Sequence, residues 1–230
     1  GIFEKYNVRA IYGTHLPALR PMHQIVSRPG ELMARASEVT ITVRGQSTHC
    51  AQPENGNDCI GAAAQLVTRL YEMERSLDPD QLRIVKFGMF HGGTVRNILP
   101  QSCELQGSYR CFQDELFHTM VQRSQAIMRD IEQESGCTIQ FDYTEGYPPV
   151  INDAALFAQV RQLLPQLQIL DQPQMIAEDF AFYQRKIPGV FLFLGTGSGI
   201  PLHNCRFNFD ESVLQTGIQM DLSLLRTRLD

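Results

Sequence analysis

The sequence predicts an α/β protein in which one domain is inserted into another. Residues 36–146 carry strand and helix patterns in the order β-α-β-β-α-β, and this set is complete in itself. The flanking segments differ in character and include the continuous apolar run 189–195, which is typical of a parallel strand buried on both faces. We therefore expect a discontinuous α/β domain formed by 1–33 and 147–230, with an inserted α+β domain formed by 34–146.

The elements of the inserted domain follow from alternation and from helical spacing. Asn57 or Asp58 can cap the first helix, and Gly136 suits the C-cap of the second. The order of these elements is that of a ferredoxin-like split β-α-β fold. The predicted elements are strand 36–44, helix 57–76, strand 81–93, strand 103–112, a helix from 114 to about 135, and strand 137–146.

The flanking segments predict a second layer of helices and strands. A short β-branched run at 8–13 predicts a strand that ends near Gly13, and helices are expected at 153–164 and 177–186. The last helix is expected at 211–229. Its predicted inward face carries Val213, Leu214, Ile218, Leu222 and Leu225.

Bulk composition excludes several classes of partner. The 230 residues carry a net charge of −5 with no long basic run, which argues against nucleic acid and anionic membranes. No apolar stretch approaches the length of a membrane span. The six cysteines form no Cys-x-x-Cys pair, so we expect reduced thiols and a cytoplasmic protein. The first residues lack a Met and a signal peptide, and we expect that an upstream segment precedes them.

Two histidines follow apolar strands of the α/β domain. His15 follows the strand at 8–13, and His203 follows the run 189–195 and the loop "GTGSGIP". Ligands of open α/β sheets bind outside the carboxyl ends of strands, so the two imidazoles could converge on a zinc-type metal site. Spacing alone leaves the alternative open that each is a loop histidine with a backbone partner. Glu178 and Asp179 either favour a helix start or support a metal-bound histidine.

Three polar residues of the inserted domain are candidates for binding or catalysis. His49 lies on a polar loop with no carboxylate or second histidine nearby, so it is either solvated or catalytic with partners elsewhere. Arg110 lies at the end of a strand between less polar neighbours, and a guanidinium can grip a carboxylate through two hydrogen bonds. Asn97 can donate to the same group, although each residue alone also fits an ordinary surface position.

Eight stretches in order resemble one family of enzymes. They are "GTHLPAL", "ITVRGQSTHCAQPENGND", "HGGTVRNILP", "GSYRCF", "GYPPVIND", "AEDFAFY", "PGVFLFLGTG" and "PLHNCRFNFDE". These stretches resemble the aminoacylase-type metallohydrolases, in particular the hippurate hydrolase and N-acyl-amino-acid amidohydrolase branch. Auxin-conjugate hydrolases are similar too, and the resemblance covers nearly all of the chain.

The resemblance implies a zinc-peptidase-like α/β catalytic domain built around two divalent metal ions, with an inserted ferredoxin-like lid that carries a homodimer contact. Zinc is the expected metal, with manganese, cobalt or nickel as alternatives. By the resemblance, His15 and His203 are metal ligands. His49 reaches the neighbouring subunit's site and steadies the oxyanion, while Asn97 and Arg110 bind the substrate's carboxylate.

The implied activity is hydrolysis of the amide bond of N-acyl amino acids or small peptides. The family's other metal ligands and its general-base glutamate lie upstream of the matching stretches, so we expect this chain to be the later portion of such an enzyme. The alternative is a non-catalytic dimerisation or binding fragment without a complete metal site. The apolar residues Leu16, Phe180 and Phe182 indicate an apolar acyl pocket.

Overall fold

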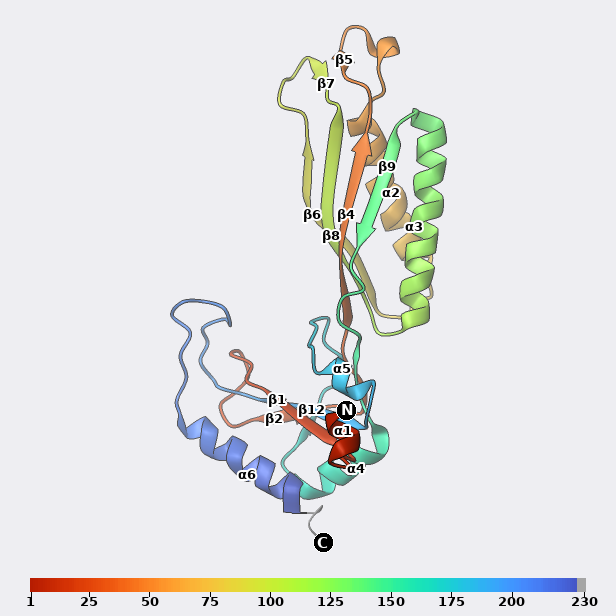
Figure 1. Ribbon diagram of the computed structural model, residues 1–230. Coiled ribbons are helices and arrows are strands. Elements are labelled where there is room, and N and C mark those ends of the chain that lie inside the picture. Colours follow the sequence, from red (N-terminus) through yellow and green to blue (C-terminus); the bar gives the residue numbers. More distant parts are fainter. Residues whose placement is uncertain (227–230) are drawn as a thin grey trace. The chain divides into compact units, whose positions relative to one another are not determined.

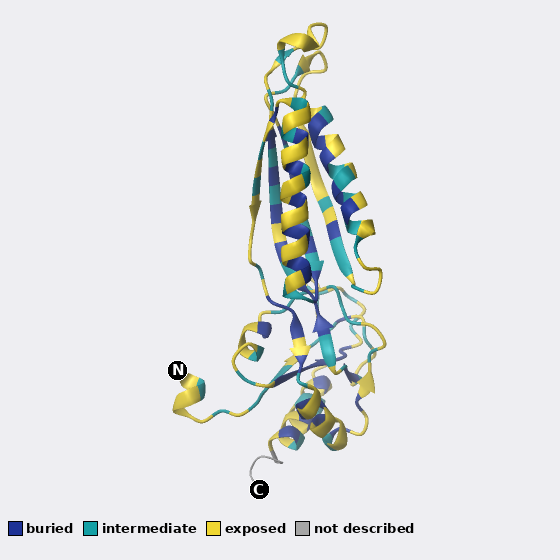
Figure 2. Cartoon of the chain, turned by 90° about the vertical axis from the view of Figure 1, so that its right-hand side faces the viewer, coloured by how far each residue is buried: buried dark blue, intermediate teal, exposed yellow. Residues whose placement is uncertain are grey.

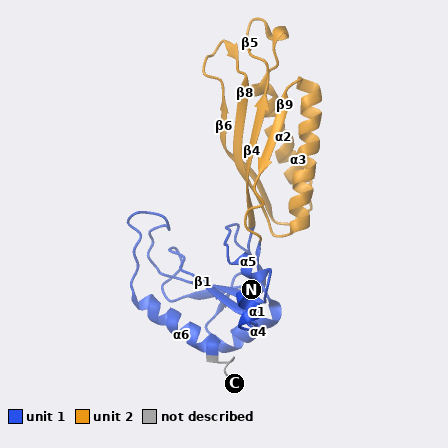
Figure 3. Cartoon of the chain, in the orientation of Figure 1, with its two compact units in different colours: residues 1–34, 149–230 blue, residues 35–148 orange. Residues whose placement is uncertain are grey.

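The computed structural model describes residues 1–226 of the chain and divides it into two compact units. Unit 1 consists of Gly1–Ala34 and Pro149–Asp230, and unit 2 is the continuous segment Arg35–Pro148 (Figure 3). These boundaries lie within two residues of those expected from the sequence. None of the helices in the described part of the chain is long and apolar enough to cross a membrane.

Unit 2 is an antiparallel sheet covered on one face by two helices (Figure 1). Its main elements run in the order β-α-β-β-α-β, and the strands lie in the order β6-β8-β4-β9. They are β4 (Arg35–Arg44), α2 (Cys59–Ser76), β6 (Arg83–Gly92), β8 (Ser102–Cys111), α3 (Asp114–Ser135) and β9 (Thr138–Tyr143). Both expected helix ends are present, because Asp58 accepts hydrogen bonds from the first turn of α2 and Gly136 adopts a left-handed φ of 68° after α3.

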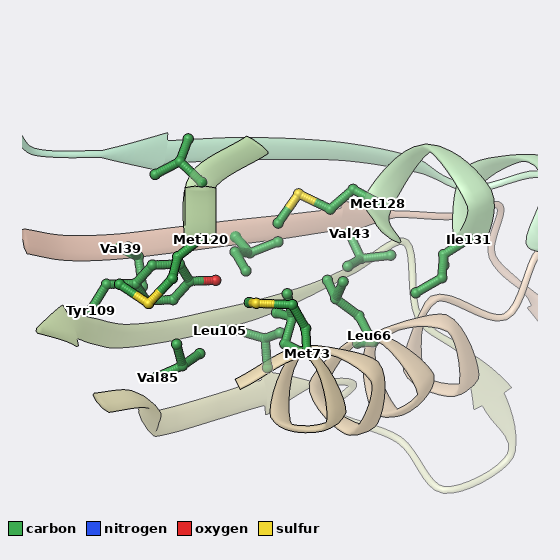
Figure 4. Close-up of a cluster of buried hydrophobic side chains, with 14 of the residues drawn as sticks. Val39, Val43, Leu66, Met73, Val85, Leu105, Tyr109, Met120, Met128 and Ile131 are labelled. Atoms are coloured by element: carbon green, nitrogen blue, oxygen red, sulfur yellow. The ribbon is translucent and has the colours of Figure 1, made fainter. Parts of the chain in front are cut away.

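The core of unit 2 lies between the sheet and its two helices (Figure 4). Alternate residues of β4 point into it, namely Val39, Ile41 and Val43, as the two-residue period of a strand requires. Tyr109 is fully buried there, and its hydroxyl is hydrogen-bonded to Ser124 Oγ at 2.9 Å. Burial raises the pKa of Tyr109 to about 12, so the phenol stays neutral and packs as part of the core.

A small arm extends from the end of the sheet where β8 begins. It contains β5 (Thr48–His49), the short 3-10 helix Pro53–Asn55 and β7 (Ile98–Leu99). β5 and β7 pair with each other as a separate two-stranded antiparallel sheet (Figure 1). The arm therefore has its own backbone hydrogen bonds and presents an ordered loop at the tip of unit 2.

Unit 1 is built around a mixed sheet in the order β1-β12-β2-β11. β12 (Gly189–Leu194) is buried throughout, and it pairs in parallel with β1 (Ile11–His15) and antiparallel with β2 (Ile25–Ser27). Its two faces enter different cores, since Val190 and Leu192 belong to one cluster and Phe191 to another. The remaining elements are α1 (Ile2–Lys5), β3 (Gly30–Met33), β10 (Val150–Asn152), α4 (Ala154–Leu163), β11 (Gln168–Ile169), α5 (Ala181–Gln184) and α6 (Ser212–Arg226).

Two sequence expectations for unit 1 are wrong. The helix expected at 177–186 is reduced to the single turn α5, and the last helix does not bury the predicted face. Val213, Met220 and Leu224 of α6 are buried, whereas four residues expected to point inward are between 48% and 60% exposed: Leu214, Ile218, Leu222 and Leu225. The helix is apolar on two sides, and the periodicity could not decide which side faces the core. The end of the expected range, 227–229, lies outside the described residues.

The cysteines are distributed between core and surface, and no disulfide links them. Cys50 and Cys205 are exposed, whereas the other four are buried. Burial, together with the nearby Cys59 thiol, raises the pKa of Cys103 to about 11. The pKa of Cys59 is also raised, by burial and by the neighbouring Cys137. The thiols of Cys59 and Cys103 are therefore held in their unreactive, protonated form.

Arg35 begins unit 2 and ties three of its segments together. Its guanidinium bonds to Asp114 at 3.0 Å and to Glu145 at 2.5 Å, and it stacks 4.0 Å from the centroid of the Phe117 ring. Arg35 is only 6% exposed, whereas the Glu145 carboxylate is largely in water. The contacts to the partly buried Asp114 and the fully buried Phe117 are therefore the ones that contribute most to the stability of the unit.

We predict that Arg35→Met lowers the free energy of unfolding by about 2 kcal/mol, the size typical of hydrogen bonds to charged groups. Urea denaturation followed by circular dichroism measures this change. Arg69→Met is the matched control, because it removes an exposed ion pair to Glu134 in the same unit and should have a much smaller effect. Equal midpoints for the two variants would contradict the prediction.

Candidate functional site

His15 is the last residue of β1 and lies at the carboxyl end of that strand. Its ring packs edge-on against Phe193 of the neighbouring strand, with ring centroids 6.2 Å apart. The pKa of His15 is lowered, first by burial and second by the charge of His203. The two histidines are therefore close enough to interact, and the His15 imidazole is held in its neutral form.

The loop after β12 runs alongside the loop after β1, and backbone hydrogen bonds join the two. Thr196 N–H donates to Pro17 O at 3.3 Å, and Gly197 N–H donates to Arg20 O at 2.8 Å. A third bond runs from Gly199 N–H to Ala18 O at 3.1 Å. These contacts bring residues about 180 positions apart in sequence to one end of the sheet, which is how His203 reaches His15.

The loop that carries His203 depends on left-handed backbone conformations. Gly197 and Gly199 have φ values of 63° and 69°, which glycine adopts at little cost. His203 itself has a φ of 66°, which most L residues avoid. The chain keeps an imidazole at a position where glycine fits the backbone better, and such strain is typical of functional sites.

A cavity of about 450 Å³ opens beside His15 in unit 1. Its lining is mostly apolar, but the residues are not those expected from the sequence, since Leu16, Phe180 and Phe182 do not line it. Phe180 is instead buried against Phe191, with ring centroids 5.0 Å apart, and Phe182 is about half exposed. Sequence reasoning also missed Arg20, which lines the cavity. The only signal in the sequence is its position, because Arg20 follows His15 by five residues.

Glu178 and Asp179 precede the single turn α5 and lie beside each other. The pKa of Glu178 is raised, chiefly by burial and then by its hydrogen bond to Asp179 and by that residue's charge. Within residues 1–226, no group of three or more His, Cys, Asp or Glu side chains could hold a metal ion. His15 and His203 are thus the two candidate ligands that the described residues bring together.

His49 and Asn97 meet at the tip of unit 2. His49 pairs with Ile98 across the β5–β7 arm, and Asn97 Nδ2 lies 3.5 Å from His49 Nε2. The backbone N–H of Ala51 donates to His49 Nδ1 at 3.1 Å. Because Nδ1 accepts, a neutral His49 carries its proton on Nε2, so Nε2 is a donor on an exposed side chain and pairs with the Asn97 amide when that amide turns its oxygen, rather than Nδ2, towards the ring.

Arg110 lies at the opposite end of β8 from this tip. It is paired with Ala36 in the strand register, whereas Ser102, the first residue of β8, lies beside the arm. Eight residues of extended strand separate Ser102 from Arg110, a span of about 27 Å. Within unit 2, one small ligand cannot contact both Asn97 and Arg110 of the same chain.

The lowered pKa of His15 predicts how the stability of the metal-free chain depends on pH. The unfolded chain takes up a proton near the ordinary value of 6.5, but the folded chain resists it. Stability is therefore fully present above pH 6.5 and falls as the pH drops below that value. His15→Asn should reduce this slope in urea denaturation at pH 5 to 7, whereas His91→Gln, at an exposed position, should leave it unchanged. An unchanged slope in His15→Asn would contradict the lowered pKa.

The left-handed backbone at His203 predicts an order of stability for two variants. His203→Gly relieves the strained backbone, whereas His203→Ala keeps a Cβ in a conformation that costs about 1 kcal/mol. Urea midpoints should therefore place the glycine variant above the alanine variant. The reverse order would show that the loop does not hold residue 203 in this conformation.

The sequence and the fold both match known proteins. The family model described as peptidase family M20/M25/M40 matches residues 1–227. The N-acetyldiaminopimelate deacetylase of Halalkalibacterium halodurans is 31% identical over 222 residues, which cover 94% of this chain and 60% of that protein. The chain thus spans about 60% of the length of that curated relative.

Solved structures show the same mixed α/β fold. A protein from methicillin-resistant Staphylococcus aureus has a TM-score of 0.88 at 24% identity, covering all of this chain and 61% of its own. The Bacillus subtilis YXEP protein, described as a dinuclear metal binding peptidase of the M20 family, has a TM-score of 0.77 at 26% identity, covering 94% and 56%. Because the family model matches residues 1–227 of its 230, the chain belongs to the M20/M25/M40 peptidase family.

Proposed function

We propose that this protein is a metal-dependent amidohydrolase that cleaves the amide bond of N-acyl amino acids or small peptides, as aminoacylases and hippurate hydrolases do. The observation that carries the proposal is the position of His15 at the carboxyl end of β1, beside an apolar cavity and within electrostatic reach of His203. Support comes from the relatives, one a deacetylase of an N-acetylated amino acid and another a dinuclear metal binding peptidase.

Two divalent metal ions are the proposed cofactors, zinc first and manganese, cobalt or nickel as alternatives. Imidazole binds all of these metals, and the lowered pKa of His15 keeps its ring in the neutral form that can act as a ligand. Zinc sites use three or four protein ligands, so His15 and His203 would supply part of the set. The bound metals would supply an activated water and positive charge at the amide carbonyl.

We assign the other candidates to substrate binding and charge stabilisation. His49 Nε2–H is the donor to the developing oxyanion, a contribution worth about 3 kcal/mol in other enzymes. Asn97 and Arg110 hold the substrate's carboxylate. Because Asn97 and Arg110 lie at opposite ends of β8, this assignment needs two chains, with His49 and Asn97 from one subunit and Arg110 from the other. Unit 2 would then be a ferredoxin-like lid that carries the contact of a homodimer.

The alternative is a non-catalytic dimerisation or binding module. Its motivation is that the described residues 1–226 supply no cluster of three or more metal-binding side chains, but the match to a family of hydrolases does not favour it. The two proposals differ in what the complete protein does with metal and substrate, which the next experiment decides.

We predict that the complete protein, loaded with zinc or manganese, hydrolyses N-acyl amino acids such as N-benzoylglycine and loses this activity on treatment with a chelator. His203→Ala should reduce both the bound metal, measured by atomic emission, and turnover. A complete protein that binds no metal and cleaves no member of an N-acyl amino acid panel would favour the binding module.

Mixing two impaired variants, assayed at a low concentration of a carboxylate-bearing substrate, tests the arrangement across subunits. His49→Ala should lower kcat by about 100-fold or more, and Arg110→Ala should weaken binding of carboxylate-bearing substrates. If His49 and Arg110 of one site come from different chains, a mixed dimer regains one intact site. Equal amounts of the variants, unfolded and refolded together, should then recover roughly a quarter of the activity, since half of the randomly paired dimers are mixed. No recovery would place both residues in the same chain's site.

A further inference from the structure

We propose that the cavity beside His15 binds an acyl group with an apolar body and a terminal carboxylate, and that Arg20 grips this carboxylate. The inference rests on the proposed function, because it treats His15 as part of the reacting centre and the cavity as its acyl site. It adds a substrate class, N-acyl amino acids whose acyl group is itself acidic.

The walls of the cavity suit an aliphatic or aromatic body. Leu19, Ile176, Phe193 and Leu202 line it together with two prolines, and its volume of about 450 Å³ is that of a small-molecule site. Such walls favour apolar groups, because burying an apolar surface releases it from water. They offer little to a polar chain, which would lose hydrogen bonds to water on entry.

Arg20 supplies the one permanent charge among the residues that line the cavity. Within residues 1–226, no carboxylate lies within ion-pair distance of its guanidinium. Its Cζ atom lies 5.9 Å from the centroid of the Phe193 ring, so the guanidinium rests over a wall of the cavity. A planar guanidinium that is not already paired is a ready partner for a carboxylate.

The Phe193 ring contacts both His15 and Arg20, and this sets an upper limit on the distance between them. The same ring contacts the His15 imidazole, with ring centroids 6.2 Å apart, and the Arg20 guanidinium at 5.9 Å. The imidazole and the guanidinium are therefore at most about 12 Å apart, taking these two distances end to end. An acyl chain of a few methylene groups can span such a gap, with its amide carbonyl near His15 and its carboxylate at Arg20.

The backbone of Arg20 is fixed by the same loop that carries His203. Gly197 N–H donates to Arg20 O at 2.8 Å, and a Cβ at Gly195 would come within 3.0 Å of Arg20 Cβ. The position of Arg20 relative to the two histidines is thus set by hydrogen bonds and close packing. This cation lies in unit 1, whereas Arg110, proposed above for the carboxylate of the amino acid, lies in unit 2.

The binding test uses the 230-residue chain freed of metal with a chelator, so that no ion can bind the probe. Hexanoate and its neutral analogue hexanamide are titrated into the isotopically labelled chain, and shifts of the His15 ring signals locate the binding. Arg20→Gln should lower the affinity for hexanoate relative to hexanamide by about tenfold, the loss expected for one charge-assisted contact. Arg20→Lys should keep most of the preference, and Arg161→Gln, on the exposed surface of α4, should keep all of it. An unchanged ratio in Arg20→Gln would overturn the proposal.

The activity test separates this inference from the proposed function. The complete, metal-loaded protein is assayed with N-adipoyl and N-hexanoyl derivatives of one amino acid, which differ only in the terminal carboxylate. Arg20→Gln should lower the adipoyl-to-hexanoyl ratio of kcat/KM by about tenfold, and Arg161→Gln should not change it. Hydrolysis of both substrates with an unaltered ratio in Arg20→Gln would sink the acidic acyl site alone. Hydrolysis of neither by the unmodified protein would sink the proposed function, while the hexanoate titration still decides whether Arg20 binds a carboxylate.

Discussion

Three backbone hydrogen bonds between the loops at 17–20 and 196–199 organise the candidate site of unit 1. Without them, nothing would hold the loop residues Arg20 and His203 near His15 at the end of β1. The bonds require the second loop to curl through left-handed conformations, which is why Gly197 and Gly199 are placed there. A buried sheet supplies the rigid base, because β12 packs on both faces and holds β1 beside it.

In unit 2, the sheet keeps two sets of polar side chains at a fixed separation. β8 pairs with a strand on each side along its whole length, so its two ends cannot approach each other. Figure 2 shows that buried and more exposed residues alternate along the strands. The buried residues pack one face of the sheet against its helices. The arm that carries His49 and Asn97 and the far end of β8 that carries Arg110 are therefore held apart, and we propose that they act as separate binding groups. In the proposed enzyme, this separation is what makes a second subunit necessary.

The sequence predicted the parts of the fold that repeat a strong local pattern. The elements of unit 2, the cap at Asp58 and the helix end at Gly136 are short-range features, and the structure has them. The sequence could not predict which side of α6 faces the core, because Leu214 and Met220 are both apolar and only tertiary packing decides which of them is buried. Arg20 was missed for a related reason, since its importance comes from Phe193 and the loop at 195–199, which are distant in sequence. Whether each histidine performs its assigned role stays a prediction.

The distribution of thiols offers a practical route to the arrangement of the two units in solution. Only Cys50 and Cys205 are exposed, and the raised pKa values of Cys59 and Cys103 keep those buried thiols protonated and slow to react. A maleimide-linked dye or spin label would thus attach next to His49 and close to His203 in the natural sequence. The chain therefore carries, without any engineering, one attachment point for a spectroscopic ruler in each unit: Cys50 in unit 2 and Cys205 in unit 1.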